Sequence, residues 1–211
     1  MAGLRAPRAG LAREQQMKVD NAFDPEEAAK CLVWIRQVTG EDIPVESVMD
    51  DRQQILDFFY ETLKDGFLLC KLANCIVPEE MQIKMKSLTF KKSTNEAFES
   101  ARERSRLEIF CDKIMEFGVP ETLTFQIDSL YEKTNLVQVY CAIRNFGMEA
   151  ESRPNFTGER FWPKKAEENK REFTDEQLKA SKSVIGLQMG TNKGASQSGM
   201  TFGKQRMITE K

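Results

Sequence analysis

The residues whose types and spacing could support binding chemistry lie near the end of the chain, between Val184 and Met207. Five glycines recur there every four or five residues: Gly186, Gly190, Gly194, Gly199 and Gly203. Because glycine costs backbone entropy in a helix or strand, this spacing predicts an irregular, extended segment. No acidic residue occurs between Glu176 and Glu210. The basic residues of that interval are Lys179, Lys182, Lys193, Lys204 and Arg206. The segment is therefore expected to contact an acidic partner surface.

Enzymatic chemistry is not expected. The stretch from Gly190 to Gly194 superficially resembles a phosphate-binding loop, but it lacks the order GxxxxGK[ST] and no apolar strand pattern precedes it. The chain has no histidine, which excludes histidine-dependent catalysis, histidine metal ligands and histidine pH switches. Carboxylate pairs such as Glu26-Glu27 are typical of helix surfaces.

The composition also argues against metals, cofactors, nucleic acid and membranes. The scattered cysteines, in apolar surroundings, indicate free thiols in a reducing cytoplasm rather than disulfides or a metal site. These cysteines are Cys31, Cys70, Cys75, Cys111 and Cys141. With 31 basic and 33 acidic residues the net charge is −2, which gives no global reason to bind nucleic acid or anionic lipid. No apolar run approaches the roughly 20 residues of a membrane helix.

The part of the chain before the basic segment predicts a compact all-α domain. The expected helices run from Asp24-Pro25 to a cap at Gly40, from Asp50 or Asp51 to Leu63, from Phe67 to Val77, from about Thr94 to Phe117, and from about Asn135 to Phe146 with Gly147 as the cap. The helix that begins at Phe67 is apolar nearly all round, which predicts a central, buried helix. The polar first half of the long helix, from Asn95 to Arg106, is expected to be solvated.

Several strings in this chain resemble the calponin and transgelin family. LKDGFLLCKLANCIVP, Leu63 to Pro78, is similar to the signature of calponin-homology domains, and FGVPETLTFQ and SLYEKTNLVQV agree with it. PKKAEENKREFTDEQL is similar to the family's connector. GLQMGTNKGASQSGM, Gly186 to Met200, resembles a calponin repeat. A single copy of the repeat is typical of transgelin-like and invertebrate muscle-type members.

The resemblance divides the chain into five parts. The expected parts are a flexible N-terminus (1–22), a calponin-homology domain (23–148), a linker (149–183), a calponin repeat (184–207) and a tail (208–211). The linker aromatics Phe156, Phe161 and Trp162 are expected to pack back on the domain. The expected fold class is all-α, with an irregular C-terminal repeat.

The resemblance implies a cytoplasmic, cytoskeleton-associated protein that binds actin filaments and organises or bundles them, or modulates contractility. The expected filament-binding residues are Gly186, Leu187, Gln188, Met189, Gly190, Thr191, Asn192, Lys193, Gly194, Ala195, Ser196, Gln197, Gly199, Met200, Lys204 and Arg206. The protein is expected to be a monomer or to self-associate weakly. The alternative hypothesis is an adaptor or signalling scaffold that uses the helical domain for contacts with other cytoskeletal or signalling proteins.

Two further expectations concern regulation and divergence. Serines and a threonine near or inside the basic segment are candidate phosphorylation sites: Ser181, Ser183, Thr191 and Ser196.

Residues 93–103 are interpreted as an insertion that lengthens a helix relative to the family pattern. Ser129 stands where the family has an acidic residue before Leu-Tyr-Glu. Both departures lie on the domain and concern its surface for partners.

Overall fold

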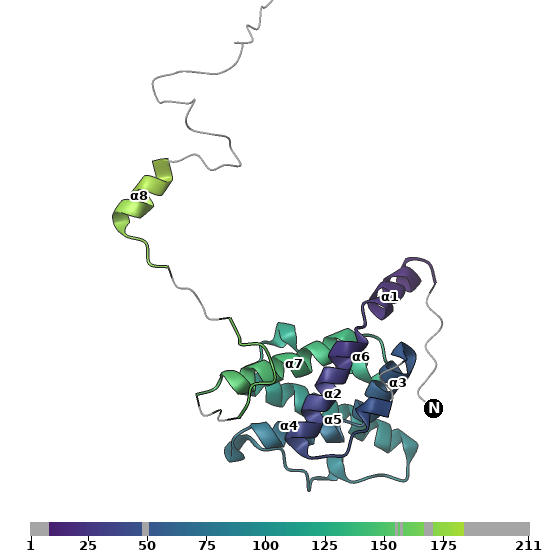
Figure 1. Cartoon of the computed structure of the whole chain (residues 1–211). Helices are drawn as coiled ribbons and strands as arrows, with labels where there is room; N and C mark the ends of the chain where they lie inside the picture. Colours follow the sequence, from purple (N-terminus) through teal and green to yellow (C-terminus); the bar gives the residue numbers. More distant parts are fainter. Residues whose placement is uncertain (1–8, 48–50, 155, 157, 167–170, 184–211) are drawn as a thin grey trace, which may run out of the picture. The chain divides into compact units, whose positions relative to one another are not determined.

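The computed structural model describes residues 9–47, 51–154, 156, 158–166 and 171–183, and the regular elements in these ranges are all helices. This confirms the predicted all-α class. The chain divides into two units, residues 1–165 and 166–211 (Figure 1). The first unit holds α1 (Leu11–Asn21), α2 (Pro25–Thr39), α3 (Arg52–Leu63), α4 (Phe67–Ile76), α5 (Glu96–Phe117), α6 (Ile127–Tyr131) and α7 (Leu136–Ser152), with short 3-10 turns η1 (Val45–Ser47), η2 (Glu79–Met81), η3 (Leu88–Phe90) and η4 (Glu121–Leu123). The second unit holds α8 (Asp175–Ser183). None of the described helices is long and apolar enough to cross a membrane.

Local capping signals set the ends of α2, as predicted. The Asp24 carboxylate accepts hydrogen bonds from the amides of Glu26 (2.9 Å) and Glu27 (3.4 Å), and Gly40 ends the helix at φ 69°. Glu27 stands three residues after Asp24, a spacing that predicts a capping box, but its side chain has other partners. Its carboxylate pairs with Lys30 at 2.8 Å and with a residue of α7 instead.

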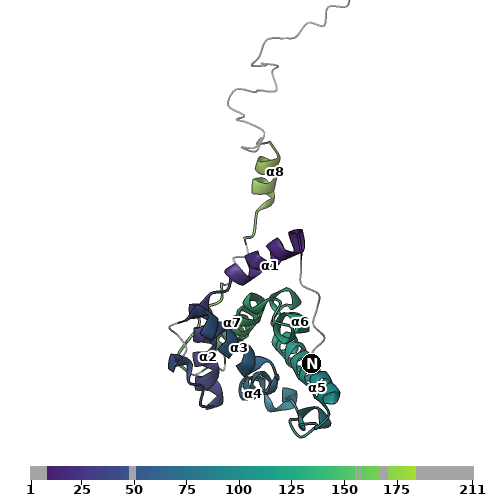
Figure 2. The ribbon, with the colours of Figure 1, turned by 90° about the vertical axis from the view of Figure 1, so that its right-hand side faces the viewer.

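Helix α4 is the centre of the domain, as its apolar sequence predicts. Leu69, Cys70, Leu72 and Ala73 are fully buried, and α4 packs against α2, α3 and α5. A fully buried leucine contributes about 2 kcal/mol through the hydrophobic effect. Figure 2 shows α2, α3, α4, α5 and α7 gathered into one bundle around this core.

Helix α7 runs past Gly147 to Ser152, so the prediction that Gly147 caps this helix is wrong. The glycine serves packing instead. A Cβ atom at Gly147 would lie 2.2 Å from Nε1 of Trp162, a distance that real Cβ contacts do not show. The missing side chain therefore makes the space in which the indole of Trp162 lies.

Helix α1 lies within residues 1–22, for which the sequence predicts a flexible segment. It has no buried residue, and no side chain caps its N-terminus. Polar contacts hold it to the bundle: Gln16 Nε2 donates to the Thr134 carbonyl at 2.9 Å, and Arg52 donates to the Asp20 carbonyl. The segment LAREQQMKVDN consists largely of good helix formers, which accounts for the local conformation.

Candidate functional site

The linker that follows α7 returns to the domain and docks there, as predicted for Phe161 and Trp162. The amides of these two residues donate to the two carboxylate oxygens of Glu151, at 3.1 Å and 3.0 Å. Glu151 is only 6% exposed, so these hydrogen bonds stabilise its buried charge. The Trp162 ring is 5% exposed and meets the Trp34 ring edge-on, with 5.7 Å between centroids. The chain therefore leaves the domain after Trp162, not at the end of α7.

Helix α8 comes shortly before the basic segment in the sequence. The amide of Thr174 donates to Gln177 Oε1 at 3.0 Å, and the amide of Gln177 donates to Thr174 Oγ1 at 3.4 Å. This reciprocal pair is a capping box. It explains why a helix begins at Asp175.

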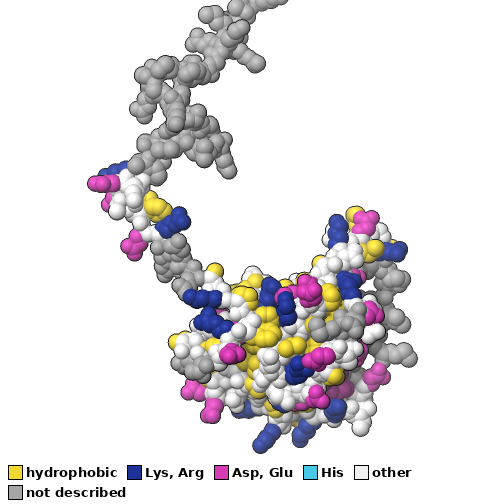
Figure 3. All heavy atoms as spheres, in the orientation of Figure 1, with side chains coloured by type: hydrophobic (Ala, Val, Ile, Leu, Met, Phe, Trp, Pro, Cys, Tyr) yellow, Lys and Arg dark blue, Asp and Glu magenta, His cyan; other side chains and the backbone are white. Residues whose placement is uncertain are grey.

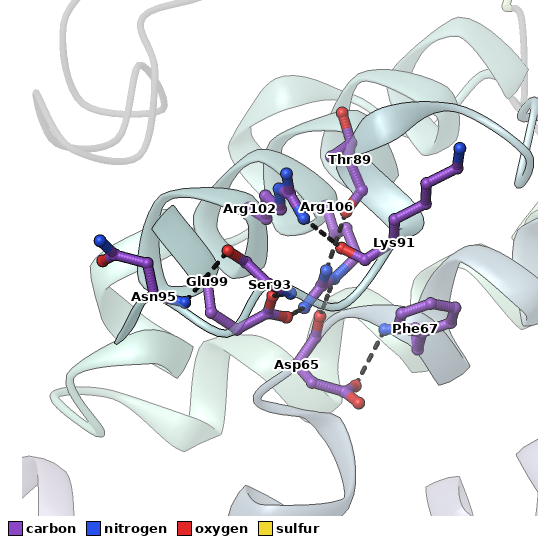
Figure 4. Close-up of polar contacts among 9 residues, drawn as sticks. All are labelled: Asp65, Phe67, Thr89, Lys91, Ser93, Asn95, Glu99, Arg102 and Arg106. Atoms are coloured by element: carbon purple, nitrogen blue, oxygen red, sulfur yellow. Dashed lines mark hydrogen bonds and ion pairs between the residues drawn. The ribbon is translucent and has the colours of Figure 1, made fainter. Parts of the chain in front are cut away.

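A buried arginine of α5 joins this helix to the segments that precede and follow α4 (Figure 4). Arg106 is 1% exposed and donates from Nε to the Asp65 carbonyl (2.5 Å) and from Nη1 to the Thr89 carbonyl (2.8 Å). Its Nη2 pairs with Glu99 at 3.0 Å, and its guanidinium lies 4.9 Å from the Phe67 ring centroid. The expectation that the first half of α5 is solvated is therefore wrong for Arg106, because distant backbone carbonyls satisfy its charge.

The same network fixes the segment that leads into α5. Glu99 accepts from the Ser93 amide at 2.6 Å through its second oxygen, while Arg102 donates to the Lys91 carbonyl at 2.6 Å. Asn95 caps α5 by accepting from the Ala97 amide at 3.0 Å. Residues 93–103, the predicted insertion, thus hold a cap and the first two turns of α5, and hydrogen bonds tie them to the preceding loop.

Three of the cysteines in the described part of the chain are buried thiols. Burial raises the pKa of the Cys70 and Cys111 thiols to about 12 and also raises that of Cys31, so these thiols remain protonated at neutral pH. Within the described ranges, no three Cys, Asp or Glu side chains come together as metal ligands would. The positions of these three buried cysteines thus indicate packing rather than reactivity.

Comparison with known proteins identifies both parts of the chain. A family model of the calponin homology (CH) domain matches residues 25–151, and a model of the calponin family repeat matches residues 185–208. The chain belongs to the calponin family. Myophilin of Echinococcus granulosus is 34% identical to it over 204 residues, which cover 97% of each protein. This confirms the resemblance drawn from the sequence motifs. Calponin-family proteins are actin-binding proteins of the cytoskeleton.

The calponin repeat itself lies outside the described residues. All of the predicted filament-binding positions from Gly186 to Arg206 fall there, as do the candidate phosphorylation sites Thr191 and Ser196. Ser181 and Ser183 belong to the last turn of α8. The structure thus describes the CH domain, the docked linker and the helix before the repeat.

Ser129, which stands where the family has an acidic residue, lies inside the domain. Ser129 is 4% exposed and its hydroxyl donates to Gln138 Oε1 at 3.0 Å. This hydrogen bond connects α6 to α7, and both of its side chains are uncharged. The departure from the family pattern is thereby a change inside the domain.

Sequence reasoning missed one surface of the CH domain, which we call the lysine loop, residues 81–95. It connects α4 to α5 and contains four exposed lysines, Lys84, Lys86, Lys91 and Lys92, and no acidic residue. Figure 3 shows basic side chains at the lower edge of the molecule, where Figure 1 places this connection. The acid-free interval between Glu80 and Glu96 is the sequence signal that could have revealed it.

Proposed function

We propose that this protein binds actin filaments chiefly through the basic, glycine-spaced residues 184–207, and that the CH domain carries this segment. The observation that supports the proposal most is the match of a calponin repeat to a stretch without acidic residues. Actin filaments present an acidic surface, so Lys193, Lys204 and Arg206 supply complementary charge. Leu187 and Met189 supply apolar anchors, and the glycines permit close approach of the backbone.

A single repeat gives weak, salt-sensitive binding, because exposed charges are screened at physiological ionic strength. Filament bundling then requires a second contact or self-association of the protein. The docking of Trp162 supports the role of the domain as a carrier, since it fixes where the tethered segment begins. We further propose that the protein is associated with the actin cytoskeleton. We propose neither a catalytic function nor a cofactor for it.

An adaptor function is the second candidate, and a groove in the domain favours it. The groove has a volume of about 820 Å³ and lies between α1, α3, α5 and the α6–α7 turn. In its wall the Arg104 guanidinium stacks on Tyr131 at 4.4 Å from the ring centroid and pairs with Asp128 at 3.2 Å. Mixed charged and aromatic walls of this kind suit a protein segment rather than a small apolar ligand.

Co-sedimentation with actin filaments over a salt series tests the proposal. The full chain is compared with a chain that ends at Ser183, which keeps α8 intact. We expect the full chain to sediment with filaments at low salt and to dissociate as salt rises, and the shortened chain to lose most of its binding. Undiminished sedimentation of the shortened chain would contradict the proposal and favour the CH domain as the contact.

A matched pair of variants separates charge from the loss of the whole segment. The first replaces Lys193, Lys204 and Arg206 by glutamine. The second, a control, replaces three lysines of the domain that pair with acidic residues: Lys30, Lys71 and Lys113. We expect weaker filament binding only in the first, because both variants lose the same charge but only the first loses it from the repeat.

A further inference from the structure

The lysine loop presents basic charge that the domain does not neutralise. Lys84, Lys86, Lys91 and Lys92 are all exposed, and within the described part of the chain none of them forms an ion pair. Other lysines of the domain behave differently, since Lys71 pairs with Glu41 in the same bundle. The loop therefore has four charges available for an acidic partner.

The lysine loop and the first turn of α5 each expose one large apolar side chain. Leu88 is 70% exposed and Phe98 is 63% exposed, so both side chains offer apolar area to a partner. Phe98 and Arg102 are four residues apart on α5 and so share one face of the helix. Arg102 in turn donates to the Lys91 carbonyl, which brings the loop against that face (Figure 4).

The surface is held in a fixed shape before any partner arrives. Arg106 ties the Thr89 carbonyl to the body of the domain, and Glu99 ties the Ser93 amide to Arg106. Gly66 allows α5 to lie close to the start of α4, because a Cβ there would be 2.8 Å from that of Arg106. A preorganised surface loses little conformational entropy on binding and so suits contact with another protein surface.

We propose that the lysine loop, together with Phe98 and Arg102, is a second docking surface for the acidic actin filament. This inference rests on the proposed function of the C-terminal segment. Four exposed lysines complement the acidic filament, and Leu88 and Phe98 supply the apolar contacts. Joining this surface to the repeat in one chain makes the second contact intramolecular, which strengthens two weak sites. An anionic membrane is the competing partner for such a surface, but Leu88 and Phe98 lie on separate elements with basic residues between them and do not form one insertable tip.

The test uses four proteins: the full chain and the chain ending at Ser183, each with and without glutamine at the four lysines. The substitutions are Lys84→Gln, Lys86→Gln, Lys91→Gln and Lys92→Gln. In the full chain we expect about a tenfold weaker filament affinity at low salt and a shallower salt dependence. In the shortened chain we expect weak residual sedimentation that disappears with the four substitutions. Equal affinity of the substituted and unsubstituted full chains would overturn the inference alone, whereas failure of the unsubstituted full chain to sediment would overturn the proposed function as well.

Two controls define the cause of any change. A charge-matched variant with Lys18→Gln, Lys30→Gln, Lys71→Gln and Lys113→Gln loses the same charge elsewhere and is expected to bind filaments almost as the unsubstituted chain does. Phe98→Ser tests the apolar part of the surface without altering charge and is expected to weaken binding too.

Sedimentation with vesicles of phosphatidylcholine and phosphatidylserine is measured in parallel. Loss of vesicle binding with unchanged filament binding would assign the surface to lipid and overturn the inference.

Discussion

Glu99 and Arg106 form an ion pair at 3.0 Å in which the arginine is almost fully enclosed and the carboxylate reaches the surface. The pair joins two turns of α5, and the remaining donors of Arg106 join that helix to Asp65 and Thr89. One side chain thus holds three segments that are far apart in the sequence. Its removal is expected to affect both the stability of the domain and the shape of the lysine loop.

Arg106→Ala is expected to lower the free energy of unfolding by about 3 kcal/mol, because it leaves buried carbonyl groups unpaired and opens a cavity. Urea unfolding followed by circular dichroism measures the change. Arg102→Ala is the control, since this arginine makes one hydrogen bond at the surface and is expected to cost less than about 1 kcal/mol. Equal effects of the two substitutions would contradict the central role of Arg106.

The Glu99 carboxyl is expected to make the stability of the domain depend on pH. Hydrogen bonding from the Ser93 amide lowers the pKa of this carboxyl, and Arg106 adds to the shift while burial opposes it. A carboxyl with a lowered pKa in the folded state stabilises the fold above its unfolded pKa of about 4.3, and the stabilisation is lost as the pH falls through the folded value. We expect Glu99→Gln to reduce stability at pH 7 and to differ progressively less from the unsubstituted protein as the pH falls below the unfolded pKa. Thermal unfolding at a series of pH values measures both, and a difference that stays constant with pH would refute the assignment.

Gly147→Ala is expected to displace the indole of Trp162, since the added methyl group would occupy its position. Trp162→Ala removes the same contact and is expected to cost about 3 kcal/mol. Because both changes break one interaction, the double variant should be much less destabilised than the sum of the single variants. Strict additivity in denaturant unfolding would show that the two residues act independently.

Phosphorylation at the end of α8 is expected to weaken filament binding. Ser181 and Ser183 lie in the last helical turn, where the helix dipole disfavours negative charge, and they precede the basic segment. Ser181→Glu with Ser183→Glu should lower filament affinity about threefold or more in co-sedimentation at low salt. The corresponding alanine variants should bind like the unsubstituted protein, and unchanged binding of the glutamate variant would argue against this regulation.

The helices whose ends depend on neighbouring residues could be predicted from the sequence. Asp24, Pro25 and Gly40 bound α2 as expected, and of the two candidate caps for α3 the structure selects Asp51, which accepts from the Gln53 amide at 2.8 Å. Such signals act within a few residues, so they can be recognised without knowledge of the fold. The calponin-like repeat could likewise be recognised, because a long and unusual string carries it.

Features that depend on distant partners could not be predicted in this way. Gly147 looks like a cap when only its own helix is considered, and Arg106 looks like a surface residue when only its polar neighbours are considered. The first is explained by Trp162 and the second by carbonyl groups at Asp65 and Thr89. The lysine loop was missed for another reason, since the absence of acidic residues in a loop is not a secondary-structure signal.

The return of Trp162 to α7 changes where the folded domain can safely be cut. A fragment that stops at Ser152, where the last helix of the bundle ends, would leave Trp34 and Gly147 uncovered and the Glu151 carboxylate without its two amide donors. We expect such a fragment to express poorly and to aggregate on size-exclusion chromatography, while one that continues to Lys165 remains monodisperse. The short aromatic segment after α7 thus belongs to the folded domain, because it covers apolar side chains that the helices alone leave open.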